Sequence, residues 1–205
     1  MSKNDKKEKI DKEVKVILLG ECGVGKTNII SRYTEDKFDE DSISTTGSSY
    51  IMKIVTKDNV NYRLNLWDTA GQEKFRAITK MFLQEANIIL LVYSIIEETT
   101  FDSLNYWYNT VIDNCGTDVV ICIVGSKYDL FCEEVVSEEE AKKFAKEKNA
   151  IFKFVSAKKD KLSIDELFNL ALDEYIKKCS YNKKNQSIKI ENKPKSEKKE
   201  KKKCC

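Results

Sequence analysis

The stretch Gly20–Thr27, which runs Gly-Glu-Cys-Gly-Val-Gly-Lys-Thr, constrains the fold more than any other part of this sequence. It follows the apolar run Val14–Leu19, which predicts a buried strand, and it precedes Asn28–Tyr33, which predicts the first turns of a helix. A strand, a glycine-rich turn and a helix in this order are typical of a phosphate-binding P-loop. Glycine lets the backbone approach an anion closely, so that N–H groups and the helix N-terminus surround the phosphates.

The polar end of this turn predicts both a phosphate contact and a metal contact. Lys26 would place its charge at the β- and γ-phosphates, and Thr27 would offer its hydroxyl to Mg²⁺. A chance glycine turn before a helix is the weaker alternative, because the preceding strand and the Lys-Thr pair are both present. The nucleotide-binding residues predicted here are Gly20, Glu21, Cys22, Gly23, Val24, Gly25, Lys26, Thr27 and Asn28.

The rest of the apolar pattern predicts a sheet whose strands alternate with helices. Ile88–Ser94 and Val119–Gly125 are continuous apolar runs typical of central parallel strands, and Ile151–Val155 is a shorter one. Tyr50–Val55 and Tyr62–Trp67 flank a short turn and predict an antiparallel hairpin. We therefore expect an α/β fold, a P-loop NTPase with a doubly wound, six-stranded, mostly parallel sheet, one antiparallel edge strand and about five helices.

Serine residues mark the starts of two predicted helices. Ser137 precedes three glutamates and forms a capping-box pattern. Ser163 is the predicted cap of a helix over Ser163–Lys178. A further helix is predicted from apolar residues at helical spacing over Phe101–Val111.

Length and charge predict one domain with a basic tail. We expect a disordered lead-in over residues 1–13, a folded domain over 14–178 and a flexible tail over 179–205. Residues 180–205 hold ten lysines and three acids, a charge of +7. Because the whole chain has a net charge of +2, residues 1–179 have a net charge of −5. A mildly acidic domain argues against nucleic-acid binding.

The sequence contains no histidine and seven cysteines, which excludes His-based acid/base chemistry and a Cys/His zinc site. Cys115, Cys122, Cys132 and Cys179 lack C-x-x-C spacing, so we expect free thiols in a reducing compartment. The longest apolar run, Ile88–Ile96, is too short to span a bilayer, and no secretory signal pattern is present. We therefore expect synthesis in the cytosol.

A second polar motif follows the predicted strand Tyr62–Trp67. Asp68 stands at the tip of this strand, where a second Mg²⁺ contact, usually through water, is required beside a P-loop. Gly71 can bring its N–H to the γ-phosphate, and Gln72 can orient an attacking water. A surface acid followed by a turn glycine is common, but beside a P-loop it becomes the weaker interpretation.

Together with the P-loop, the segment Trp67–Arg76 resembles switch II of the Rab family, within the Ras superfamily of small GTPases. The resemblance covers nearly the whole chain from Val14. It implies that 14–178 is a G domain that binds GTP or GDP with Mg²⁺. Phe38 would then pack on the guanine, and Thr45 would close onto Mg²⁺ and the γ-phosphate.

The resemblance also implies a guanine site at the ends of two predicted strands. Its residues would be Ser126, Lys127 and Asp129, followed by Ser156, Ala157 and Lys158. Asp129 would accept from guanine N1–H and the exocyclic amine, a donor pair that adenine lacks. The implied catalytic residues are Gln72, Lys26 and Thr45, and the implied metal residues are Thr27, Thr45 and Asp68.

The terminal pair Cys204-Cys205 resembles the Rab ending that carries two geranylgeranyl groups. Two prenyl chains beside a lysine-rich segment would hold the protein on the cytosolic face of an endomembrane compartment, from which it would cycle with the cytosol. The implied role is vesicle trafficking as a monomer. Expected partners are an exchange factor, a GTPase-activating protein, effectors, Rab escort protein and GDP-dissociation inhibitor. Two inert thiols are the alternative.

The sequence also departs from the Rab pattern. Ser126 stands where the family has Asn, which predicts weaker nucleotide retention. Thr46–Tyr50 and Lys80–Ala86 differ from the usual effector-contact segments, so we expect divergent partners. Cys22 lies where side-chain bulk approaches the γ-phosphate and either slows hydrolysis or is tolerated. The alternatives to a slow GTPase assisted by an activating protein are a non-hydrolysing nucleotide-bound adaptor at a membrane and, less favoured, an adenine-nucleotide enzyme.

Overall fold

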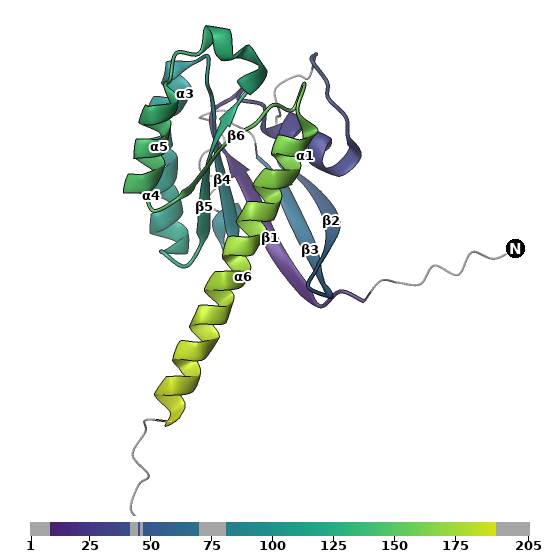
Figure 1. The fold of residues 1–205 in the computed structure, drawn as a ribbon, viewed down its shortest axis with the longest axis vertical. Coiled ribbons are helices and arrows are strands. Elements are labelled where there is room, and N and C mark those ends of the chain that lie inside the picture. The colour runs from purple at the N-terminus through teal and green to yellow at the C-terminus, as the bar shows by residue number, and fades with distance from the viewer. Residues whose placement is uncertain (1–8, 42–44, 46, 70–80, 192–205) are drawn as a thin grey trace, which may run out of the picture. The chain divides into compact units, whose positions relative to one another are not determined.

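The computed structural model describes residues 9–41, 45, 47–69 and 81–191, with side chains to residue 181. The chain divides into two compact units, Met1–Tyr175 and Ile176–Cys205. The first unit holds a six-stranded sheet with the order β2-β3-β1-β4-β5-β6 (Figure 1). Its strands are β1 (Lys12–Leu19), β2 (Ser49–Lys57), β3 (Val60–Asp68), β4 (Ile88–Ser94), β5 (Val120–Ser126) and β6 (Ile151–Phe154).

Helices cover both faces of this sheet. Figure 1 shows α3, α4 and α5 on one face and α1 on the other, where the first turns of α6 also lie. The described helices are α1 (Lys26–Glu35), α3 (Glu98–Asp102), α4 (Leu104–Cys115), the 3₁₀ helix η2 (Tyr128–Glu133), α5 (Glu138–Glu147) and α6 (Lys161–Glu191). All strand pairs are parallel except β2 with β3, which confirms the predicted doubly wound α/β fold with one antiparallel edge strand.

The hairpin of β2 and β3 turns at Asp58 and Asn59. Both residues have positive φ, at 51° and 59°. A two-residue turn with two positive φ angles matches the right-handed twist of the flanking strands, and Asp and Asn tolerate that conformation best after glycine. This turn pairs Lys57 with Val60 and so fixes the register that sets Tyr50 opposite Trp67.

The core lies between the central strands and the helices packed on them. Every residue of β4 and β5 is buried, as expected for parallel strands covered on both faces. On one face Trp107 of α4, 1 % exposed, packs in a cluster with Ile89 of β4 and Ala141 of α5. On the other, Tyr33 of α1 stacks on Phe168 of α6 at 3.8 Å between ring centroids.

Several predicted boundaries differ from the structure. β1 begins at Lys12 rather than Val14, because Asp11 N–H already bonds to Asn61 O and extends the pairing with β3. The expected single helix over Phe101–Val111 is divided at Ser103 into α3 and α4.

The predicted cap of the last helix was wrong. Asp160 caps α6, because its Oδ1 accepts from Ser163 N at 3.0 Å, three residues on. Ser163 lies inside the first turn, and its hydroxyl instead accepts from Ser156 N at 3.2 Å. The helix continues to Glu191 rather than ending at Lys178, since no proline interrupts the chain before Pro194. The flexible tail was expected over 179–205, and its residues 192–205, with Cys204 and Cys205, lie outside the described residues.

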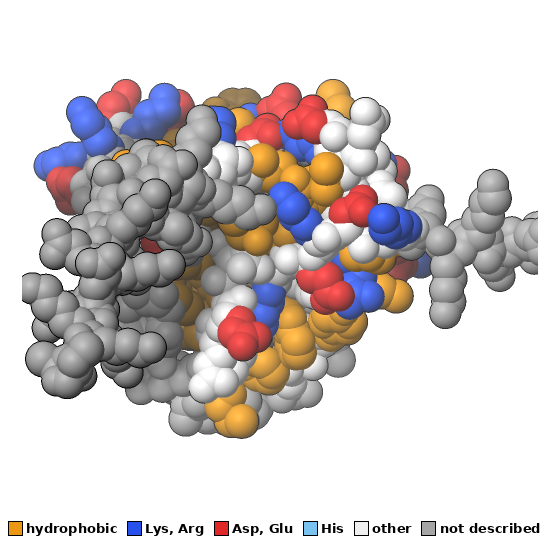
Figure 2. All heavy atoms as spheres, turned by 90° about the horizontal axis from the view of Figure 1, so that it is seen from below, with side chains coloured by type: hydrophobic (Ala, Val, Ile, Leu, Met, Phe, Trp, Pro, Cys, Tyr) orange, Lys and Arg blue, Asp and Glu red, His pale blue; other side chains and the backbone are white. Residues whose placement is uncertain are grey.

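Charged side chains of both signs are interspersed on the face that Figure 2 shows, rather than gathered into one basic patch. Across the described part of the chain, no helix combines the length and the apolar character needed to cross a bilayer.

Candidate functional site

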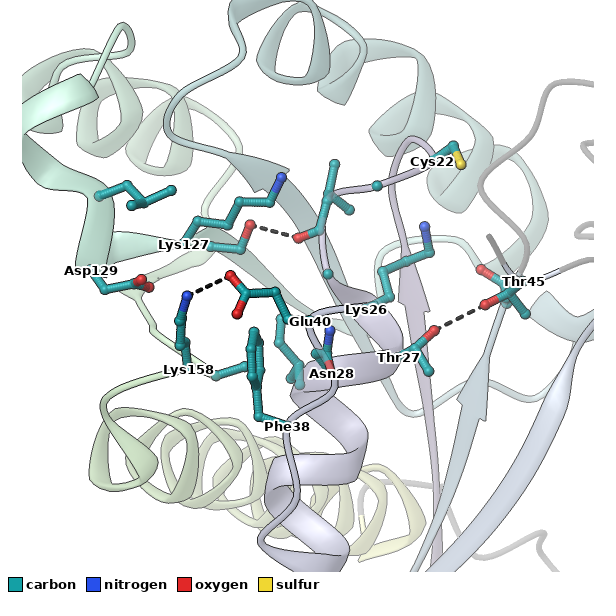
Figure 3. A pocket seen from close by; sticks show the side chains of 18 residues that line it. Cys22, Lys26, Thr27, Asn28, Phe38, Glu40, Thr45, Lys127, Asp129 and Lys158 are labelled. Carbon is teal, nitrogen blue, oxygen red and sulfur yellow. Dashed lines mark hydrogen bonds and ion pairs between the residues drawn. The ribbon is translucent and has the colours of Figure 1, made fainter. Parts of the chain in front are cut away.

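A cavity of about 410 Å³ opens where β1, β5 and β6 end and the loops after them begin (Figure 3). The carboxyl ends of parallel strands meet at one edge of a sheet, which is where such folds bind ligands. The cavity is lined by Cys22, Gly23, Val24, Gly25, Lys26, Thr27, Asn28, Ile29, Phe38, Glu40, Thr45, Thr69, Ser126, Lys127, Asp129, Leu130, Ala157 and Lys158. Segments more than one hundred residues apart in the sequence therefore share one site.

The turn between β1 and α1 needs glycine at two positions for different reasons. Gly25 has φ of 93° and is the residue before the first turn of α1, so its left-handed conformation aims the helix N-terminus at the cavity. Gly20 has φ of 144°, and a Cβ there would lie 2.1 Å from Val92 O of β4. Gly20 therefore lets the turn pass directly over the neighbouring strand.

Lys26 brings a buried positive charge to the floor of the cavity. It is 6 % exposed, and its Nζ donates to Gly20 O and Glu21 O, each at 2.8 Å. Loss of water around the ammonium lowers the pKa of Lys26 to about 8, although the carboxylate of Asp68 opposes the shift. A polyphosphate is the kind of ligand that would keep this amine charged.

Three oxygen-bearing side chains from distant segments meet beside Lys26. Thr27 Oγ1 donates to Asp68 Oδ2 at 2.7 Å and lies 2.9 Å from Thr45 Oγ1. Burial raises the pKa of Asp68, partly offset by the hydrogen bond from Thr27. The second carboxylate oxygen, Oδ1, is buried without a hydrogen-bond partner. An unsatisfied carboxylate oxygen beside two hydroxyls fits Mg²⁺, which prefers oxygen ligands.

These groups would need help to hold the ion. No cluster of three or more carboxylate or thiol side chains capable of holding a metal exists in the described segments. Mg²⁺ usually binds through one or two protein groups together with water and substrate phosphates. The residues thus fit a metal that arrives with a nucleotide.

The opposite end of the cavity presents a fixed carboxylate. Ser156 Oγ donates to Asp129 Oδ1 at 2.6 Å, and Lys159 N donates to the same hydroxyl oxygen at 3.0 Å. Ser156 is 4 % exposed and does not line the cavity, so its contact with Asp129 comes from behind the cavity wall. Asp129 keeps its other oxygen for acceptance from a ligand.

Ser126 ties the P-loop to the sheet. Its Oγ lies 2.7 Å from both Val24 O and Tyr93 O, and the residue is 3 % exposed. A hydroxyl carries a single hydrogen, so only one of these carbonyls receives a full hydrogen bond at a time. An asparagine, with two N–H donors, would have no such limit.

Contacts between segments that are distant in the sequence lie at the mouth of the cavity. Asn28 Nδ2 donates to Asp39 O at 2.9 Å, and Asp39 N donates back to Asn28 Oδ1 at 3.0 Å. Lys158 Nζ forms an ion pair with Glu40 Oε1 at 2.6 Å and lies 6.0 Å from the centre of the Phe38 ring. Figure 3 shows Phe38, Glu40 and Lys158 together at this edge.

Most of the predicted site residues meet in this cavity or directly behind it. Gly20, Glu21, Asp68 and Ser156 contact its lining residues without lining it. Gly71 and Gln72 lie outside the described residues.

Four lining residues were not predicted from the sequence: Ile29, Glu40, Thr69 and Leu130. Ile29 and Leu130 directly follow predicted site residues. Thr69 directly follows Asp68, so the motif that begins at Asp68 already pointed to it. Its hydroxyl donates to Leu18 O at 2.6 Å. Glu40 stands in an irregular polar segment, and no sequence pattern marked it as a site residue.

The chain is similar in sequence to known proteins of one family. The Ras family profile matches residues 15–190. The human "Ras-related protein Rab-22A" is 40 % identical over 157 residues, which cover 77 % of this chain and 80 % of the relative. "GTP-binding protein ypt3" of Schizosaccharomyces pombe is 37 % identical over 163 residues, or 80 % and 76 % of the two chains. Mouse "Ras-related protein Rab-12" is 35 % identical over 168 residues, or 82 % and 69 %.

Proposed function

The chain belongs to the Ras family as a Rab-type small GTPase, and we propose that it acts as a Mg²⁺-dependent switch between GTP- and GDP-bound states. The observation that supports this best is the meeting of Thr27, Thr45 and Asp68 beside Lys26. Thr45 belongs to the loop between α1 and β2, outside the P-loop. Contact with a γ-phosphate and its metal would therefore order this loop, and loss of the phosphate would release it.

Each residue at this end of the site has a role in that switch. Lys26 places its charge on the β- and γ-phosphates, while Thr27 and Thr45 supply hydroxyls and Asp68 a carboxylate for Mg²⁺. Mg²⁺, when bound, neutralises charge that develops on the phosphate oxygens. Gly71 would contact the γ-phosphate through its N–H, and Gln72 would orient the attacking water. Hydrolysis is slow on its own and is accelerated by an activating protein.

Guanine is the base that fits the opposite end. Asp129, which Ser156 holds, lines this end together with Phe38. The carboxylate would accept from N1–H and the exocyclic amine, and the Phe38 ring would pack against the base. Ala157 N–H meets O6, and Lys127 lies along the base. Adenine would leave the carboxylate without donors, which disfavours it strongly.

We further propose that the switch acts on a membrane. Geranylgeranyl groups on Cys204 and Cys205, next to a lysine-rich segment, would attach the protein to the cytosolic leaflet of an endomembrane compartment. In the GTP form it would recruit effectors for vesicle transport. An exchange factor, an activating protein, Rab escort protein and GDP-dissociation inhibitor would complete its cycle.

Two measurements on the purified full-length chain test the switch. Chromatography of the nucleotide released on denaturation should yield guanine nucleotide, because the purified protein should carry the ligand that its cavity binds. Single-turnover hydrolysis of γ-labelled GTP should proceed in the wild type and slow strongly in Gln72→Leu. Bound GTP that the wild type and Gln72→Leu hydrolyse at the same background rate would instead support the non-hydrolysing adaptor.

A further inference from the structure

Two loops that approach the cavity from different parts of the chain meet at Glu40 and Lys158. Their side chains form an ion pair at 2.6 Å, although 118 residues separate them. Both residues line the cavity, and Figure 3 shows the pair at the mouth beside Phe38. The acid of this pair also raises the pKa of Lys158 above its usual value.

Both loops are anchored to the same helix. Asn28 holds the backbone of Asp39, next to Glu40, through two hydrogen bonds of 2.9 and 3.0 Å. Arg32, four residues further along α1, donates from Nε to Ala157 O, next to Lys158, at 2.7 Å. Residues four apart lie on one face of a helix. Glu40 and Lys158 are thus held in reach of each other by α1, which lowers the entropy cost of pairing them.

We propose that the Glu40–Lys158 ion pair is a latch that closes over the bound nucleoside and slows its release. The proposal rests on the proposed function, because it assumes that a guanine nucleotide fills the cavity. A nucleoside leaving between the two loops must part them, so separation of the charges adds to the barrier for release.

The size of the effect follows from exposure. The side chain of Glu40 is 71 % exposed and that of Lys158 is 41 % exposed. Exposed ion pairs contribute little and are screened by salt, so we expect an effect of about two- to fivefold on the release rate. A latch of this strength tunes exchange without locking the nucleotide in place.

Release of tritiated GDP into excess unlabelled GDP, measured in Mg²⁺ buffer by filter binding, tests the latch. Glu40→Gln should release GDP about two- to fivefold faster than the wild type. Lys158→Gln should also release it faster, and the double variant should add nothing to the effect of Lys158→Gln. Glu35→Gln is the matched control, because it breaks an exposed ion pair with Lys37, at 2.7 Å, that does not line the cavity.

The outcomes separate the latch from the proposed function. Unchanged release from Glu40→Gln, or single effects that multiply in the double variant, would overturn the latch while leaving guanine nucleotide binding intact. A wild type that retains no tritiated GDP would refute the proposed function, and the latch with it. Acceleration in Glu40→Gln but not in Glu35→Gln, with no further gain in the double variant, supports the latch.

Discussion

Ser156 donates its hydroxyl hydrogen to Asp129 Oδ1 at 2.6 Å from behind the cavity wall. The bond fixes the orientation of the carboxylate through only one of its two oxygens. Ser156 also accepts from Lys159 N at 3.0 Å, which ties the same hydroxyl to the start of the next turn. The direction of Asp129 is therefore set by the fold before any nucleotide binds.

Removal of this hydroxyl should weaken guanine binding more than it weakens the fold. We predict that Ser156→Ala lowers GDP affinity about tenfold, because a charge-assisted hydrogen bond of about 1.5 kcal/mol no longer orients Asp129. Isothermal titration with GDP measures the affinity, and Ser163→Ala serves as the control, since its hydroxyl contacts Ser156 N but not Asp129. Equal affinities of Ser156→Ala and the wild type would contradict the prediction.

Ser126 should limit how long the protein holds its nucleotide. One hydroxyl hydrogen serves Val24 O and Tyr93 O, both at 2.7 Å, so the P-loop is only partly tied to β4. Ser126→Asn should slow GDP release about 5- to 30-fold if one further hydrogen bond of about 1 to 2 kcal/mol forms. Ser126→Ala should speed release. An off-rate that is the same in Ser126→Asn and the wild type would refute this reason for weak retention.

The close approach of the P-loop to β4 predicts a large cost for a single methyl group. Gly20→Ala would place Cβ 2.1 Å from Val92 O. We expect the free energy of unfolding of the nucleotide-free protein to fall by about 2 to 5 kcal/mol. Gly116→Ala is a matched control, because Gly116 also has positive φ, at 68°, yet its added Cβ would meet nothing within 4 Å. Denaturant titrations that give equal losses for both variants would exclude the clash as the cause.

Binding should take up protons at alkaline pH. Burial lowers the pKa of Lys26 to about 8 in the nucleotide-free protein, and bound phosphates would raise it. GDP should therefore bind most tightly below about pH 8, where Lys26 of the free protein is charged. Its affinity should fall by up to about tenfold per pH unit as the pH rises through this value. Titration calorimetry at about pH 8.5 in buffers of different ionisation heat should detect uptake of about three quarters of a proton.

The control for this effect is Lys26→Arg, whose guanidinium stays charged throughout the range. If it binds GDP at all, it should do so without proton uptake. A wild type that binds GDP at about pH 8.5 with no proton uptake would show that Lys26 is already fully charged in the free protein.

Local patterns predicted the parts of the fold that short segments determine. Asp58 and Asn59 tolerate positive φ, so the hairpin turn was visible in the sequence. The cap of α6 could not be predicted from the sequence, because Asp160 and Ser163 are both good capping residues. The choice between them depends on Ser156, whose backbone N–H bonds to the Ser163 hydroxyl.

In the site, too, local patterns predicted some residues, but contacts between distant segments could not be predicted. The P-loop, Asp68 and Asp129 could be predicted, because each lies at or shortly after the end of a recognisable strand. The pairing of Glu40 with Lys158 could not, since it joins an irregular segment to a loop 118 residues away. Only the three-dimensional arrangement around α1 brings these two residues together.

Competition binding tests the central claim most directly, namely that one cavity selects guanosine phosphates together with Mg²⁺. The chain, loaded with tritiated GDP, is challenged with unlabelled GDP or ADP, with Mg²⁺ present or chelated. We predict that GDP competes at a concentration at least about 10³-fold lower than ADP, and that chelation of Mg²⁺ weakens GDP binding. Equal competition by ADP and GDP, or binding indifferent to Mg²⁺, would contradict the account.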